Sequence, residues 1–264
     1  MASVSLACGG GSEVSEPSLL TWEEFRDAAY QEPDTGVWIT NGDELAETEA
    51  LLREAYDRYA AERAEPLDAK FARASDAPLI VNTVSGRDDV WPQSVALNIT
   101  YCVDQKSFGS RYAAVVSAMN AAAADWESAA SVNFVHASQY DANCTSRTNV
   151  VFNVRQVTSV QYLARAFFPS TSRRSRELLI ASSAFGNIQP WTLTGVLRHE
   201  LGHSIGFRHE HTRPEAGTCY ENDSWRALTA YDSDSVMHYP QCNGTNDGDL
   251  VLTSLDRSGA AALY

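Results

Sequence analysis

The sequence predicts an α+β fold in which one globular domain follows a shorter and mostly helical segment. At 264 residues and 44% hydrophobic content, the chain is long enough for one packed domain and one extra segment. Beyond residue 78, short runs typical of β-strands alternate with one long alanine-rich helix. A further predicted helix carries two histidines four residues apart, which favours a site built on that helix.

The first part of the chain is predicted to be a tether followed by two helices. Residues 1–17 are rich in glycine and serine and hold little apolar material, so we expect them to be flexible. Residues 21–24 (TWEE) have the form of a capping box and predict a short helix. Residues 37–40 are predicted as a strand that leads into an Asn41-Gly42 turn, and residues 44–64 as a long amphipathic helix.

Residues 66–78 contain small and polar residues, a composition expected of an exposed connector that a protease can cut. Residues 79–264 are expected to form the main domain. Its predicted elements are a helix at 112–130 and strands at 79–84, 95–103, 132–135, 149–154, 162–168 and 177–181.

The string H-E-x-x-H-x-x-G-x-x-H, residues 199–209, predicts a zinc site. His199 and His203 lie on one face of a helix and can both point to one ion. Gly206 can adopt the left-handed conformation that ends a helix, so that His209 approaches the ion from another side. Three imidazoles leave a coordination position open, which is typical of catalytic zinc. Glu200 is the candidate general base for a water at the single ion.

This string resembles the zinc signature of the astacins, which are metzincin metallopeptidases, and residues 235–239 (SVMHY) resemble their Met-turn. The resemblance covers residues 79–264. It implies a metzincin-like fold with a twisted mixed sheet, an active-site helix and a C-terminal subdomain that contains the Met-turn. It also implies that Met237 forms a hydrophobic floor beneath the histidines and that Tyr239 is a further zinc ligand which also helps to stabilise the oxyanion.

Two features outside the zinc string also resemble astacins. Glu210 matches the residue that receives the new amino terminus after processing; a solvated carboxylate is the other interpretation. Astacins are held latent by an aspartate that ligates the zinc, and residues 40–43 (TNGD) resemble that stretch without its Phe. Asp43 is therefore a candidate latency switch in a prosegment formed by residues 18–65; an ordinary turn is the alternative.

The resemblance further implies that an edge strand before the zinc helix binds substrate by strand addition. Residues 162–168 and residues 177–181 are the two candidates for this edge. The loop between them contains Arg173, Arg174 and Arg176, which are interpreted either as a solvated hairpin tip or as an attraction for acidic substrate side chains.

The chain has five cysteines and no C-x-x-C pair. Two local bridges, Cys102 with Cys144 and Cys219 with Cys242, are the first choice among three connectivities and favour an oxidising compartment. Cys8 is left over, and its context SLAC resembles the end of a bacterial lipoprotein signal, although the charged start and long apolar stretch of such a signal are missing. A lipid anchor at Cys8 is therefore one interpretation, and a fortuitous match is the other.

The formal net charge of −14 argues against nucleic acid or an anionic membrane as a partner. No apolar run is long enough for a membrane span, and we expect a secreted or cell-surface monomer. The predicted function is zinc-dependent hydrolysis of internal peptide bonds in proteins or peptides, by a protein made as a latent zymogen. The alternatives are a zinc amidase that acts on cell-wall crosslinks and a matrix-binding protein without turnover.

Overall fold

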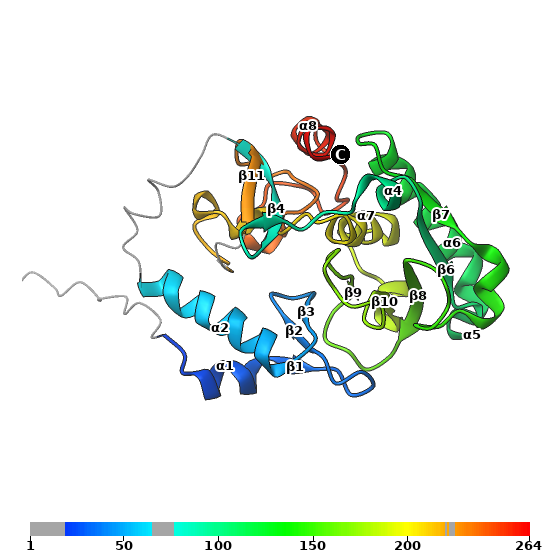
Figure 1. Ribbon diagram of the computed structural model, residues 1–264, viewed down its shortest axis with the longest axis horizontal. Coiled ribbons are helices and arrows are strands. Elements are labelled where there is room, and N and C mark those ends of the chain that lie inside the picture. The colour runs from blue at the N-terminus through cyan, green and yellow to red at the C-terminus, as the bar shows by residue number, and fades with distance from the viewer. Residues whose placement is uncertain (1–18, 65–76, 220, 222–224) are drawn as a thin grey trace, which may run out of the picture.

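The computed structural model describes residues 19–64, 77–219, 221 and 225–264. The predicted tether at residues 1–17, Cys8 within it, and the connector up to residue 76 lie outside the described residues. In Figure 1 the N-terminal elements, coloured blue to cyan, lie to one side of a larger body that contains the remaining helices and strands.

The N-terminal segment, residues 19–64, is a helical pair with a small sheet. Thr21 caps the first helix through the predicted capping box with Glu24, so that prediction is confirmed. The strand order is β1-β2-β3, and both pairings are antiparallel. The elements are α1 Trp22–Ala28, β1 Tyr30–Gln31, β2 Trp38–Thr40, β3 Glu44–Ala46 and α2 Glu49–Ala64.

The second helix begins later than predicted. Asn41 and Gly42 have φ values of 52° and 97°, and this turn reverses the chain so that residues 44–46 pair with β2 as a strand. The Thr48 hydroxyl then accepts a hydrogen bond from the Leu51 amide at 3.2 Å and caps the helix. The prediction of a helix from residue 44 was therefore wrong for its first residues, because the hairpin turn makes them a third strand of the small sheet.

The body is built on a five-stranded mixed sheet with the order β7-β6-β8-β10-β9. Four strands are parallel, whereas β9 is antiparallel to β10 and forms one edge. The elements from residue 93 to residue 204 are α4 Gln93–Ala96, β6 Ile99–Val103, α5 Gln105–Phe108, α6 Tyr112–Glu127, β7 Phe134–His136, β8 Phe152–Val157, β9 Ala164–Arg165, β10 Glu177–Ala181 and α7 Leu193–Ser204.

Several predicted strand boundaries change in the structure. The run 95–103 begins as a helical turn, because Pro92 accepts backbone hydrogen bonds from Val95 and Ala96, and only Ile99–Val103 is a strand. The strands predicted at 132–135 and 149–154 begin two or three residues later. Of the two candidate edges, residues 177–181 form the interior strand β10, whereas residues 162–168 supply the edge strand β9.

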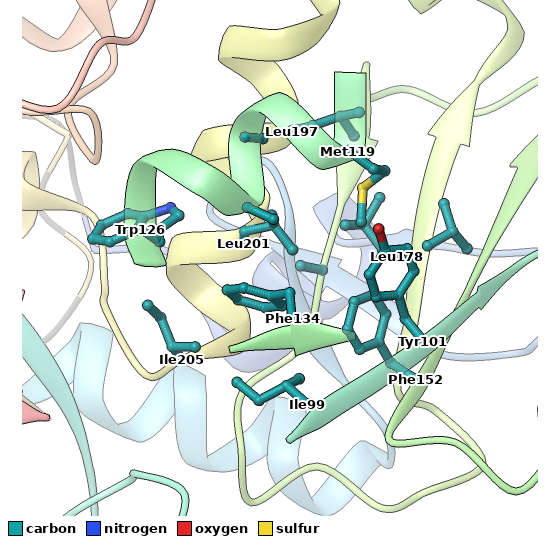
Figure 2. Close-up of a cluster of buried hydrophobic side chains, with 14 of the residues drawn as sticks. Ile99, Tyr101, Met119, Trp126, Phe134, Phe152, Leu178, Leu197, Leu201 and Ile205 are labelled. Carbon is teal, nitrogen blue, oxygen red and sulfur yellow. The ribbon is translucent and has the colours of Figure 1, made fainter. Parts of the chain in front are cut away.

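A smaller antiparallel sheet has the order β11-β4-β5 and lies next to the C-terminal helix. Its strands are β4 Ala77–Val84, β5 Arg87–Asp88 and β11 Trp225–Thr229, and the helix is α8 Ser254–Leu263. The main core lies between the five-stranded sheet and helices α6 and α7. Figure 2 shows its large side chains, with Trp126 of α6 and Leu201 of α7 on one side and Phe152 and Leu178 of the sheet on the other.

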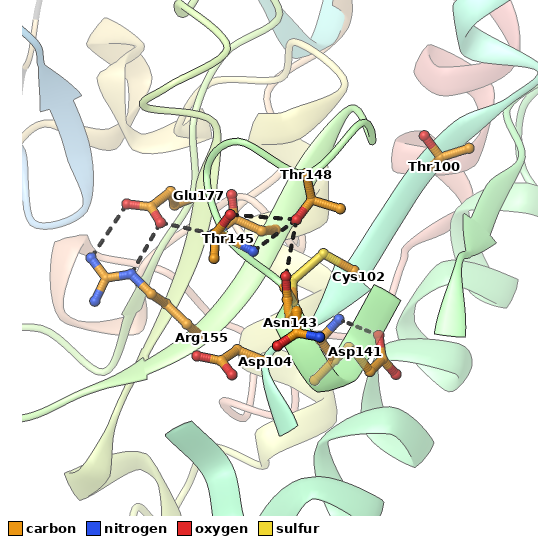
Figure 3. Close-up of a disulfide and its surroundings, with 12 residues drawn as sticks. Thr100, Cys102, Asp104, Asp141, Asn143, Thr145, Thr148, Arg155 and Glu177 are labelled. Carbon is orange, nitrogen blue, oxygen red and sulfur yellow. Dashed lines mark hydrogen bonds and ion pairs between the residues drawn. A yellow bond between two sulfur atoms is a disulfide. The ribbon is translucent and has the colours of Figure 1, made fainter. Parts of the chain in front are cut away.

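Both predicted disulfides are present. Cys102 is bonded to Cys144 and Cys219 to Cys242. Figure 3 shows the first bridge at the end of β6, near the ion pair of Arg155 with Glu177. Two disulfides indicate folding in an oxidising compartment. Within the described ranges, every helix is too short or too polar to cross a membrane.

Candidate metal centre

Helix α7 places two of the predicted zinc ligands. The Thr192 hydroxyl accepts a hydrogen bond from the Gly195 amide at 3.0 Å and caps the helix. The helix packs along α6, where the Trp126 indole donates to the Arg198 carbonyl at 2.8 Å. His199 and His203 are each only 2% exposed and face the same side, as one helical turn requires.

The chain then turns back at Gly206, as predicted. Gly206 has φ 100°, and a Cβ at this position would lie 2.4 Å from the Asp89 carbonyl oxygen. Its amide bonds to the His203 carbonyl at 2.9 Å, which closes the end of the helix. His209 follows three residues later and is fully buried beside the other two histidines.

Each imidazole has one nitrogen committed to an acceptor. The Nδ1 atoms of His199 and His203 lie 2.8 Å from the carbonyl oxygens of Val236 and Phe207, and Nδ1 of His209 contacts the Glu221 carboxylate. The three Nδ1 atoms are therefore the protonated ones, and the three Nε2 atoms present lone pairs.

The three Nε2 atoms converge. His203 Nε2 lies 3.2 Å from Nε2 of both His199 and His209. Lone pairs that face each other at this distance repel unless a cation lies between them. Two nitrogens that each lie about 2.05 Å from a tetrahedral zinc ion are about 3.3 Å apart, so the spacing fits zinc.

Asp43, from the turn after β2, completes a group of four buried donors. Its Oδ2 lies 3.3 Å from His199 Nε2, and its Oδ1 lies 3.6 Å from His203 Nε2 and 3.1 Å from His209 Nε2. Among the described residues Asp43 Oδ1 has no hydrogen-bond partner, as expected of an oxygen that binds an ion. Three imidazoles and one carboxylate form a donor set that zinc accepts.

Glu200 is buried next to this group, and its Oε2 has no hydrogen-bond partner within the described part of the chain. Burial and the nearby charge of Asp43 raise the pKa of the Glu200 carboxyl well above its ordinary value. A carboxyl group with a raised pKa next to a metal can accept a proton from water and later return it.

Tyr239 lies between the histidines and the N-terminal segment. Its hydroxyl donates to Asp43 Oδ2 at 2.5 Å, and its ring stacks on His199 at 5.4 Å between centroids. His211, which the sequence analysis did not select, contacts the same ring at 4.8 Å and accepts a hydrogen bond from the Tyr239 amide at 3.2 Å. Burial lowers the pKa of His211 to about 4, so it acts here as a neutral acceptor.

Met237 lies beneath the histidines. A Cβ on Gly202, in the turn of α7 between His199 and His203, would lie 2.4 Å from the Met237 sulfur, so the side chain packs directly on the helix. The Met-turn is fixed by Asp256 of α8, which accepts hydrogen bonds from the Ser235 hydroxyl at 2.6 Å and the Val236 amide at 2.9 Å. The Val236 carbonyl in turn holds His199.

Glu221 is the main residue of the site that sequence reasoning missed. It is buried and contacts His209, and it also accepts hydrogen bonds from Thr212 at 2.7 Å and Arg208 at 2.8 Å. A carboxylate on the second nitrogen of a metal-ligating histidine fixes the ring orientation and strengthens the ligand. The sequence carried no signal for this role, because Glu221 is twelve residues beyond His209 and belongs to no recognised spacing.

Glu210 is the remaining site residue that the sequence predicted. Glu210 is fully buried, so the solvated interpretation was wrong; Oε1 accepts the Asp232 amide at 3.1 Å and faces Arg213 at 3.3 Å. Burial raises the pKa of Glu210 well above its ordinary value. The His238 ring is hydrogen-bonded to the Tyr231 hydroxyl at 2.8 Å.

The loop with Arg173, Arg174 and Arg176 is not simply a solvated hairpin tip. Arg173 donates to the Thr148 carbonyl at 2.8 Å and Arg176 to the Thr171 carbonyl at 2.7 Å, so both hold the loop in place. Arg174 is exposed. Beside the metal cluster, a cavity of about 540 Å³ is bordered by Ala164 at the edge strand, Val196 and Glu200 of α7, and the Met-turn residue Tyr239.

Comparisons with known proteins agree with this geometry. Residues 90–236 match the family model Peptidase_M10, described as Matrixin, which is more than half of the chain. The fold and site therefore define a metzincin metallopeptidase. The chain belongs to the matrixin family by this match, and its relatives confirm the predicted resemblance to astacin-like metzincins.

Among those relatives, bone morphogenetic protein 1 of Xenopus laevis is 29% identical over 199 residues, which are 67% of this chain and 24% of the relative. Zinc metalloproteinase nas-30 of Caenorhabditis elegans is 36% identical over 76 residues, or 22% of this chain and 10% of the relative. The matches span at most 40% of the length of these curated relatives. The solved structure of myroilysin aligns with a TM-score of 0.49 at 17% identity and covers 70% of this chain and 98% of that chain.

Proposed function

We propose that this protein is an astacin-like zinc metalloendopeptidase that is made as a latent precursor. The observation that carries the proposal is the convergence of three Nε2 lone pairs at 3.2 Å beside the buried carboxyl of Glu200. His199, His203 and His209 would hold one zinc ion. Membership in a peptidase family favours peptide hydrolysis over a cell-wall amidase or a binding protein.

When bound, zinc would lower the pKa of a water toward neutrality and polarise the peptide carbonyl. Glu200 would accept the proton of the attacking water and pass it to the leaving amine, a role that its buried position next to the three histidines supports. The Tyr239 hydroxyl, free of Asp43 after activation, donates to the developing oxyanion. Met237 packs under α7 and keeps the two helical histidines in place.

Latency rests on Asp43. Its carboxylate lies where a reactant would have to bind, and it also takes the hydrogen bond of Tyr239. We infer that residues 18–65 are a prosegment, that residues 66–78 are the connector cut on activation, and that residues 79–264 are the catalytic domain. After the cut, the buried oxygen Oε2 of Glu210 offers an acceptor for the new amino terminus.

Internal cleavage is favoured by the edge strand. In the described residues no strand pairs with the outer edge of β9, which leaves it open to an extended substrate at any point along its chain. The disulfides support secretion. A lipid anchor at Cys8 stays a prediction.

The test is digestion of a peptide library by the zinc-loaded full-length chain before and after a cut in the connector. We expect hydrolysis of internal bonds after the cut, abolished by a chelator and restored by zinc. Glu200→Gln should keep bound zinc and the folded state while its rate falls by about a thousandfold. Cell-wall fragments serve as the alternative substrate. Cleavage of those fragments alone, or full activity of Glu200→Gln, would contradict the proposal.

A further inference from the structure

The N-terminal segment makes a second charged contact with the body, away from the metal centre. Glu32 and Arg165 form a two-pronged ion pair, with Arg165 Nε at 2.7 Å from Oε1 and Nη2 at 2.9 Å from Oε2. The Tyr162 hydroxyl donates to the same Oε1 at 2.5 Å. Arg165 is 1% and Glu32 3% exposed, so the pair is enclosed by the two regions.

All three donors come from the stretch around β9, the edge that we propose to bind substrate. Arg165 is opposite Leu179 of β10, and Leu179 packs with Val37 and Ile39 of the N-terminal segment. Arg165 therefore lies on the sheet face that this segment covers. Ala164 is opposite Ile180, which belongs to the main core on the other face.

Departure of the N-terminal segment removes the acceptor and leaves the donors. Arg165 Nε, Arg165 Nη2 and the Tyr162 hydroxyl then converge on a point that Glu32 no longer occupies. The contact of Arg165 that remains is the hydrogen bond from Nη1 to the Glu177 carbonyl at 3.2 Å. Donors that the fold aims at one point bind a carboxylate through charge-assisted, two-pronged hydrogen bonds, so this point favours another carboxylate.

A substrate strand beside β9 can supply that carboxylate. Side chains directly opposite each other in neighbouring strands lie on the same face, with Cβ atoms about 5 Å apart. The substrate residue opposite Arg165 would thus point toward the position of the Glu32 carboxylate. Its neighbours along the strand would point to the other face.

We propose that Arg165 and Tyr162 form a specificity site of the activated enzyme that recognises an acidic side chain of the substrate, and that Glu32 mimics this side chain in the latent chain. This inference rests on the proposed peptidase function. The inference predicts that the substrate has one preferred acidic position, at a fixed number of residues from the scissile bond. The enzyme residues that recognise it lie outside the catalytic group.

The composition of the N-terminal segment supports a charge-based fit. Residues 19–64 hold twelve acidic and four basic side chains. Glu44 and Glu47 also contact the body, with Arg208 at 3.1 Å and Ser172 at 2.6 Å. Glu32 differs from both, because its partners lie on the predicted substrate strand and the Glu44 partner Arg208 keeps Glu221 as a second acceptor.

The experiment uses the full-length chain, folded with zinc, cut in the connector and freed of the N-terminal fragment by gel filtration. Paired peptides differ only by Glu or Gln at one position, and each position on both sides of the scissile bond is tested in turn. We expect the Glu peptide to be cleaved roughly tenfold faster in kcat/KM at one position only. Arg165→Gln should bring this ratio close to one.

Arg87→Gln is the matched control, since Arg87 is exposed on β5 of the other sheet, and it should keep the parent ratio. If Arg165→Gln does not fold, Tyr162→Phe removes one donor with little change of volume and should lower the ratio by about threefold. No preference for Glu at any position, or an unchanged ratio in both variants, would overturn the inference. Cleavage of the Gln peptides in that case leaves the peptidase proposal intact, whereas no cleavage of any peptide would refute that proposal instead.

Discussion

The N-terminal segment and the body of this protein differ in how much apolar core stabilises each of them. The body has a large apolar core in which Trp126 and Phe152 are fully buried. The N-terminal segment has a few buried apolar side chains: Val37, Ile39, Ala46 and Leu52, and helix α1 has none. The body therefore has the core of an independent domain, whereas the segment depends on what it covers.

Besides an apolar cluster that joins Val37 and Ile39 to Leu179, the two regions share polar contacts that are acidic on one side. Glu32, Asp43, Glu44 and Glu47 of the segment each bind a basic, hydroxyl or metal-centre group of the body. Buried ion pairs add little net stability compared with apolar packing, although loss of one partner is costly. If the connector is cut as proposed, we expect this interface to separate more readily than a purely apolar one, because water can solvate both charges. This difference is consistent with the prosegment role that we propose for the segment.

The strongest test of this comparison is Asp43→Ala in the uncut chain. The variant removes the carboxylate beside the three histidines, so we expect basal peptide hydrolysis to rise by about a hundredfold or more. Asp57→Ala, on an exposed turn of α2, is the matched control and should stay latent. Complete latency of Asp43→Ala would mean that the segment blocks the site by bulk alone.

Tyr239→Phe should lower the activity of the cut chain and weaken the latency of the uncut chain. In the cut chain we expect a loss of up to roughly a hundredfold in kcat, because one oxyanion donor is removed, and a smaller loss than in Glu200→Gln. In the uncut chain the Asp43 carboxylate loses its hydrogen bond from Tyr239. The ratio of uncut to cut activity should therefore be higher in Tyr239→Phe than in the parent. Equal losses in the cut and uncut forms would show that Tyr239 does not link the two regions.

A pair of core variants can test whether the segment is the weaker region. Leu52→Ala in α2 should destabilise the segment by about 2 kcal/mol or more and speed its hydrogen exchange, while the thermal midpoint of the body stays unchanged. Ile99→Ala in β6 is the control and should lower the midpoint of the body. A single shared transition that shifts equally in both variants would argue against two regions of different strength.

The parts of the site that could be predicted from the sequence are those formed by residues close together in the chain. The histidine string, the Met-turn and both disulfides are local patterns, so their residues were predictable one by one, and the resemblance placed Asp43 beside the histidines, where the structure has it. Glu221, His211 and Asp256 act on the ligands across loops, and their spacing carries no period or motif. The Glu32–Arg165 pair joins positions 133 residues apart, and only the folded chain brings those two charges together.

The mildest test uses acid to weaken the interface. Burial opposes ionisation of Glu32, but the hydrogen bonds and charge of Arg165 outweigh it and lower its pKa. A carboxyl with a lowered folded pKa contributes its full stability above its ordinary pKa of about 4.3, and this contribution is lost as the pH falls through the lowered value. In the cut chain, the parent should therefore retain its N-terminal fragment better than Glu32→Gln at pH 7, by gel filtration. The two should converge as the pH falls below about 4.3, the ordinary pKa of a glutamate. A gap that stays constant with pH would show that the Glu32 charge does not hold the fragment.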